Sequence, residues 1–208
     1  MAQALHARPT HSIRNLTVGA LVIWFMLALA GSLLGVFDSG LRRPPLALGL
    51  AAVVPVAVFV FCYLTSSRFQ DFVSSVDLRL LTAAQTGRVA GIVFLILYQQ
   101  GALPGVFALP AGWGDVAIGI TAPLVAWSWK HPWPYRTFVV WNVLGTVDLV
   151  TAVGLGVLAS PTPVGVLAGD VTTRLMGQFP LSLIPTFFVP LYLIFHLICL
   201  ERVRKGRA

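Results

Sequence analysis

The chain has 208 residues, of which 57% are hydrophobic and 10% are charged, and its formal net charge is +7. This composition lies far outside the range of soluble globular domains. At roughly twenty residues for each crossing of a bilayer, the length allows about six transmembrane helices with short loops, and it leaves no room for a separate soluble domain. We therefore expect any function to lie within the membrane or at its faces.

Six predominantly apolar runs follow one another along the chain. They predict spans at about 16–37, 46–65, 89–109, 112–129, 137–159 and 181–200. The expected fold is all-α: a compact six-helix transmembrane bundle over 16–200, between a basic N-terminal tail (1–15) and a basic C-terminal tail (201–208). The first run stays apolar to Phe37, longer than a signal-peptide core, which favours a retained helix.

Lys and Arg gather on alternate sides of these spans. If both termini share one face, that face carries eleven of the 14 basic residues, and the other carries Arg42, Arg43 and Arg174. The positive-inside rule then predicts that both termini are cytoplasmic, most simply in a bacterial-type plasma membrane. The expected partners are the lipid bilayer and the anionic headgroups of its cytoplasmic face. We expect no nucleic-acid binding, because no segment is long enough to form a folded basic surface.

An amphipathic segment joins the second and third spans. Phe69, Phe72, Val76 and Leu80 recur at three- and four-residue steps, which predicts a helix with one apolar face. No Gly or Pro interrupts residues 66–86. The helix is therefore expected either to lie in the cytoplasmic interface or to continue into the third span.

Polar side chains at membrane depth are the strongest candidates for a site, because an ionisable group at a helix centre costs roughly 2.5–3.5 kcal/mol on insertion scales. Asp148 falls near the middle of the fifth span, with Asn142 about one and a half turns nearer the cytoplasm. In the sixth span Tyr192 and His196 share a face. If the two spans are neighbours, His196 can contact Asn142 directly, or Asp148 through water.

Arg88 is expected just inside the cytoplasmic end of the third span. Two interpretations are open: the side chain snorkels to a lipid phosphate, or it turns inward and neutralises a buried carboxylate. Arg88 completes the predicted intramembrane polar cluster, whose other members are Asp148, His196, Asn142 and Tyr192.

A second polar group is expected at the outer side. Asp115 lies near the predicted start of the fourth span, where a carboxylate suits a helix N-terminus. Gln99 and Gln100 fall at a similar depth and are natural hydrogen-bonding neighbours. The alternative is an outer acidic ring with Asp170 that attracts cations.

Pro190 lies inside the sixth span and is expected to kink it. Its ring removes a backbone hydrogen bond to the carbonyl of Thr186, which then needs another donor. The break is either a hinge that lines a cavity, as in transporters, or a static kink that improves packing.

No cofactor and no metal site are predicted. Cys62 and Cys199 are the only cysteines, too few for a zinc site or a disulfide framework. The sequence also lacks a phosphate-binding loop and a zinc-protease motif.

Three classes of function remain. The favoured one is a small-solute or proton translocating or binding protein that uses the polar cluster. The alternatives are a membrane-embedded enzyme acting on a lipid-like substrate, with His196 and Asp148 as acid and base, and a non-catalytic membrane subunit or assembly factor. The balance leans away from an enzyme, and no catalytic residue is assigned. Homo-oligomerisation through glycine-rich helix faces stays open.

Overall fold

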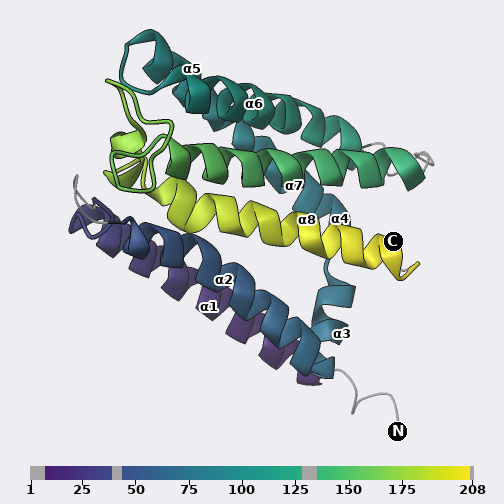
Figure 1. Ribbon diagram of the computed structural model, residues 1–208. Helices are drawn as coiled ribbons and strands as arrows, with labels where there is room; N and C mark the ends of the chain where they lie inside the picture. The colour runs from purple at the N-terminus through teal and green to yellow at the C-terminus, as the bar shows by residue number, and fades with distance from the viewer. Residues whose placement is uncertain (1–7, 39–43, 128–134, 207–208) are drawn as a thin grey trace, which may run out of the picture.

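A computed structural model describes residues 8–38, 44–127 and 135–206, and these parts of the chain are helical with connecting turns and contain no strand (Figure 1). The elements in chain order are α1 (Arg8–Leu33), α2 (Leu46–Thr65), α3 (Ser67–Ser75), α4 (Leu78–Ala84), the 3₁₀ helix η1 (Gln85–Gly91), α5 (Ile92–Gln99), α6 (Gly105–Trp127), α7 (Tyr135–Leu158), the 3₁₀ helix η3 (Thr173–Gly177), the π-helical turn η4 (Ile184–Phe188) and α8 (Val189–Arg204).

Within the described residues, six helical stretches are long and apolar enough to cross a membrane, which confirms the expected all-α fold with six such helices. They are Ile13–Leu33, Leu46–Thr65, Leu78–Gln99, Gly105–Trp127, Arg136–Leu158 and Ile184–Arg204. The second has the predicted bounds. Helix α1 begins at Arg8 and α8 continues to Arg204, so parts of both predicted tails are helical.

The third and fourth helical stretches have other bounds than the predicted spans. The third stretch begins at Leu78, after the carboxylate of Asp77 accepts a hydrogen bond from the amide of Arg79 at 2.8 Å. It ends at Gln99, because Gly101 reverses the chain. The φ of Gly101 is 69°, a backbone conformation that residues with a side chain rarely adopt. The fourth therefore begins at Gly105. These shifts move Arg88 and Asp115 from the ends of their spans to the middle.

The amphipathic segment is divided into two helices. Ser66 caps α3 by accepting from the amide of Phe69 at 3.3 Å, and α3 ends before Val76, whose backbone is extended. The guanidinium of Arg202 in α8 donates to the carbonyl of Val76 at 3.0 Å. Helix α4 thus continues into the third span, as one of the two predicted alternatives had it, whereas α3 is a separate short helix.

The start of the sixth span is irregular where Pro190 was expected to kink an α-helix. The structure instead has the π-helical turn η4, and α8 begins at Val189, so Pro190 lies in its first turn. The carbonyl of Thr186 accepts a hydrogen bond from the indole nitrogen of Trp24 at 3.1 Å. The donor that this carbonyl needs therefore comes from α1.

Helix α8 lies between α2 on one side and α7 on the other, with α6 and α5 beyond α7 (Figure 1). The buried apolar side chains form two separate clusters. One includes Ile118, Trp141 and Ile198, and the other, nearer the loop between α7 and η4, includes Phe107 and Ala111. Along α6, Ala111 and Ile118 belong to different clusters, so Asp115 lies in a polar layer between them.

Candidate intramembrane polar site

Four ionisable or polar side chains, each near the middle of its own membrane-length stretch, meet inside the bundle. Arg88 comes from η1, Asp115 from α6, Asp148 from α7 and His196 from α8. The 3₁₀ geometry of η1 interrupts the third stretch at the position of Arg88. Such a mid-helix interruption is typical of a hinge or a strained functional segment.

Arg88 is the centre of the cluster, and its side chain has no exposed surface. Its Nε donates to Oδ1 of Asp115 at 2.7 Å, and its Nη2 donates to Oδ2 of Asp148. Its Nη1 donates to the carbonyl of Gly145 at 3.3 Å and contacts Nε2 of His196 at 3.2 Å. The guanidinium therefore turns inward, which is the second of the two interpretations of its sequence position, and it bridges three helices.

The hydrogen bonds around His196 define a neutral imidazole. A guanidinium has no acceptor, so Nε2 of His196 accepts from Arg88. Nδ1 then carries the proton and donates to Oδ1 of Asn142 at 2.9 Å, while Nδ2 of Asn142 donates to the carbonyl of Phe138 at 2.9 Å. His196 and Asn142 are both fully buried. Both ring nitrogens are thus engaged, Nε2 by Arg88 and Nδ1 by Asn142.

The charges of the cluster do not balance. Arg88 carries one positive charge, and Asp115 and Asp148 carry two negative charges when both are ionised, with His196 neutral. The side chains of Asp115 and Asp148 keep 13% and 15% of their surface exposed, whereas that of Arg88 keeps none. An uncompensated charge in an apolar interior costs several kcal/mol, so a proton or a cation is expected to complete the cluster.

Three glycines make room for the ionisable members of the cluster. A Cβ at each of them would overlap a cluster side chain from another helix. The three pairs are Gly91 against Asp115, Gly114 against Asp148 and Gly145 against His196. The close approach of the helices at this depth therefore depends on the missing side chains.

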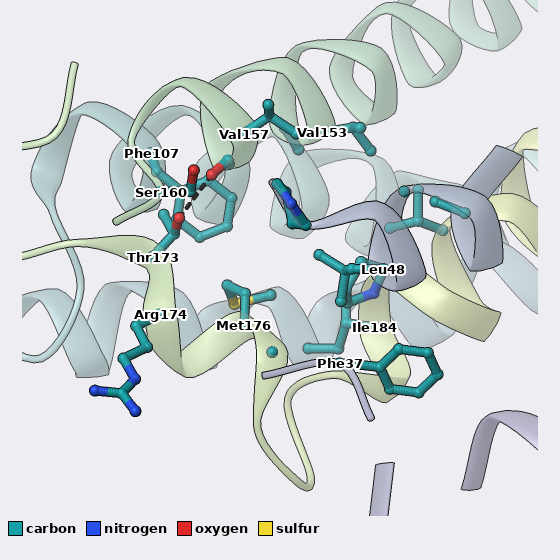
Figure 2. A pocket seen from close by; sticks show the side chains of 18 of the residues that line it. Phe37, Leu48, Phe107, Val153, Val157, Ser160, Thr173, Arg174, Met176 and Ile184 are labelled. Atoms are coloured by element: carbon teal, nitrogen blue, oxygen red, sulfur yellow. Dashed lines mark hydrogen bonds between the residues drawn. The ribbon is translucent and has the colours of Figure 1, made fainter. Parts of the chain in front are cut away.

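A cavity of about 110 Å³ extends from Asp115 toward the loop between α7 and η4. In Figure 2, Val153 and Val157 of α7 lie opposite Leu48, Met176 and Ile184. Residues of the loop line the far end of the cavity, where the hydroxyls of Ser160 and Thr162 pair at 2.7 Å and that of Thr173 donates to the carbonyl of Gly156 at 2.6 Å.

A second hollow, of about 620 Å³, runs along α2 beside α7 and α8. Its lining is almost entirely aliphatic, and it shares Ala52, Leu149, Val153 and Val189 with the cavity that reaches Asp115. The two hollows are therefore neighbours, and the second opens on the apolar side surface of the bundle.

The structure places the remaining predicted site residues as follows. The backbone carbonyl of Tyr192 accepts a hydrogen bond from Nε2 of Gln85 at 3.2 Å. The ring of Tyr192 lies beside η1, where a Cβ at Gly87 would overlap the tyrosine hydroxyl. Gln99 and Gln100 are exposed at the end of α5 and make no hydrogen bond with Asp115.

The expected outer-side polar group is therefore not formed. Asp115 cannot cap α6, because this helix begins ten residues earlier at Gly105, and Asp115 belongs to the Arg88 cluster instead. Pro104 followed by Gly105 was the sequence signal for that start, since proline favours the first positions of a helix. Asp170 lies exposed in the loop between α7 and η4. Arg42 and Arg43, which were predicted to lie at the outer face, are outside the described residues.

Within the described ranges, no three side chains of His, Cys, Asp or Glu gather in a way that could hold a metal ion. Cys62 and Cys199 are both free thiols. The chemistry of the site is therefore that of one guanidinium, two carboxylates and a neutral imidazole.

No curated protein and no solved structure matches the chain. Residues 45–204 match a family described as a domain of unknown function (DUF8737). The match covers more than half of the chain and contains every residue of the Arg88 cluster. The chain therefore belongs to this family.

Proposed function

We propose that this protein is an integral membrane protein that binds and translocates protons or a small solute through the cluster formed by Arg88, Asp115, Asp148, His196 and Asn142. The observation that carries the proposal is the charge imbalance: a fully buried arginine holds two carboxylates. In hydrocarbon surroundings the excess negative charge of such a group raises the free energy of the folded protein unless a mobile cation or proton compensates it.

Two further features support transport over a static site. Asp115 lines a cavity, so one carboxylate of the cluster can be reached from one end of the bundle. Arg88 lies in a 3₁₀ interruption and α8 follows a π-helical turn, and irregular helices of this kind serve as hinges in transporters. The distribution of Lys and Arg predicts that this cavity opens away from the cytoplasm.

The enzyme alternative has less support. His196 was its candidate acid or base, but the ring is fully buried and both nitrogens are engaged by Arg88 and Asn142. A general acid or base must come within hydrogen-bond distance of a substrate. In this arrangement His196 positions Arg88 and does not face a cavity.

Proton flux in liposomes tests the proposal. We expect purified protein to dissipate an imposed pH gradient, followed with an entrapped pH-sensitive dye, and D148N to lower the rate at least tenfold, because the variant removes one titratable carboxylate from the cluster. D170N is the matched control, since Asp170 is an exposed carboxylate outside the cluster, and it should keep the wild-type rate. A wild-type rate equal to that of empty liposomes would reject proton translocation.

A further inference from the structure

The cavity beside Asp115 presents only the negative part of the cluster to a guest. Among the described residues, the ionisable ones in its lining are Asp115 at the inner end and Asp38 and Arg174 at the outer end, and Arg88 is not part of the lining. Arg174 and Asp38 pair with each other at 3.4 Å. Of the groups in the part of the chain that the structure describes, a molecule at the inner end therefore meets a carboxylate and no free cation.

Apolar side chains form most of the remaining lining of the cavity. The inner and middle parts are formed by Phe94, Phe107, Leu149, Val153 and Ile184. The volume of about 110 Å³ is smaller than the apolar cavity of about 150 Å³ that accommodates benzene, so the body of an organic guest extends into the neighbouring hollow of about 620 Å³. The walls thus favour an apolar body, and the inner end favours one positive charge.

The neighbouring hollow gives such a molecule a route of entry. It shares Leu149, Val153 and Val189 with the cavity and lies along the apolar side of α2 and α8. An amphipathic molecule that concentrates in the bilayer can reach this side surface without crossing the loop between α7 and η4.

We propose that this cavity binds small lipophilic organic cations, with the positive charge beside Asp115 and the apolar body between α2 and α7. This inference rests on the proposed function, because it names the class of solute that completes the charge of the same cluster. The cation takes the place of the proton that otherwise compensates Asp115 and Asp148, so the two compete.

Other ligand classes fit the cavity less well. A carboxylate at the inner end repels anions. A hard metal ion needs about six oxygen ligands, whereas the walls around Asp115 are mostly carbon. A sugar would leave its hydroxyls without partners along the apolar walls. One charge on a hydrocarbon body matches both features.

Calorimetric titration of the purified full-length protein with benzyltrimethylammonium tests this inference. We expect saturable binding that weakens at least tenfold in D115N and stays within twofold of wild type in D170N. Lowering the pH should weaken binding, because protons compete for the same carboxylates. Phenylacetate, an anion with a similar body, should not bind.

A pair of variants on α7 tests the place of binding without touching the charges. V153F puts a ring into the cavity wall, whereas V147F adds the same ring to an exposed side chain that lines neither hollow. We expect V153F to weaken binding at least tenfold and V147F to leave it unchanged. Equal binding by both variants would overturn the inference, even if D115N failed to fold.

The outcomes separate this inference from the proposed function. If wild type binds no benzyltrimethylammonium but still moves protons in a way that depends on Asp148, the cation site is rejected and proton translocation stands. If the cation binds and V153F abolishes binding while no proton moves, the cavity is a cation site and the proton route is rejected.

Discussion

Arg88 determines the character of the site at the scale of single residues. Its guanidinium is enclosed by hydrogen bonds to two carboxylates, one imidazole and one backbone carbonyl. His196 accepts from it and is itself oriented by Asn142. Buried ion pairs of this kind contribute little net stability as a group, but removing one partner leaves a charge without compensation.

The variant R88L is expected to destabilise the fold by about 3–5 kcal/mol, because it leaves Asp115 and Asp148 facing each other without the cation. R174L is the matched control: its ion pair with Asp38 is half-exposed, and exposed pairs contribute about 0–1 kcal/mol. Unfolding by SDS titration in mixed micelles measures both. An R88L protein as stable as R174L would show that the cluster does not hold the helices together.

Two glycines of α7 offer a test of the packing around the cluster. G145A is expected to destabilise the protein by about 1–3 kcal/mol, because the added methyl would overlap the ring of His196. G154A has no heavy atom within 4 Å of the new methyl and should be neutral or stabilising by up to about 1 kcal/mol. The same SDS titration compares them, and equal stability of the two variants would contradict the described close approach.

Regular and irregular segments alternate at the scale of the elements. The third stretch runs from α4 through the 3₁₀ helix η1 into α5, and the sixth runs from the π-helical turn η4 into α8. Each irregular segment lies beside the cluster or the cavity. The indole nitrogen of Trp24 donates to the carbonyl of Thr186, so a hydrogen bond connects the irregular start of the sixth stretch to α1.

Replacing the indole of Trp24 tests the contribution of this hydrogen bond to stability. W24F should cost about 1–3 kcal/mol, because it leaves the buried carbonyl of Thr186 without its donor. W113F, at a largely exposed tryptophan of α6, should change stability by less than about 0.5 kcal/mol. Thermal denaturation in detergent separates the two. A W24F protein with the same thermal denaturation midpoint as wild type would mean that another group donates a hydrogen bond to this carbonyl.

Part of this arrangement could be predicted from the sequence. Six apolar runs and the polar residues inside them, Asp148 and His196 above all, are visible because a charge or an imidazole is rare in hydrocarbon. The role of Asp115 was not visible in the same way, since it depended on α6 beginning at Gly105. The glycine contacts of the cluster could not be predicted either, because they depend on how helices far apart in sequence pack.

At the scale of the whole molecule, a polar layer separates two apolar clusters and is reached by a cavity from one end. The ends of α2 and α8 meet at the opposite end, where Tyr63 donates to Glu201 at 3.1 Å and accepts from Lys205 at 2.8 Å. The cavity extends from the polar layer toward the loop between α7 and η4, whereas Ile118 and Trp141 pack against the other side of the layer.

The central claim, that water reaches the inner end of this cavity, is tested most directly by thiol labelling on α7. Single cysteines replace Ala152, which lines the cavity, or Thr151, its exposed neighbour at the same depth, in a protein lacking Cys62 and Cys199. We predict that a water-soluble, membrane-impermeant reagent added from the side of the loop between α7 and η4 modifies A152C and spares T151C, which faces lipid. Protection of both cysteines would contradict the account and leave the cluster as a structural element of the bundle.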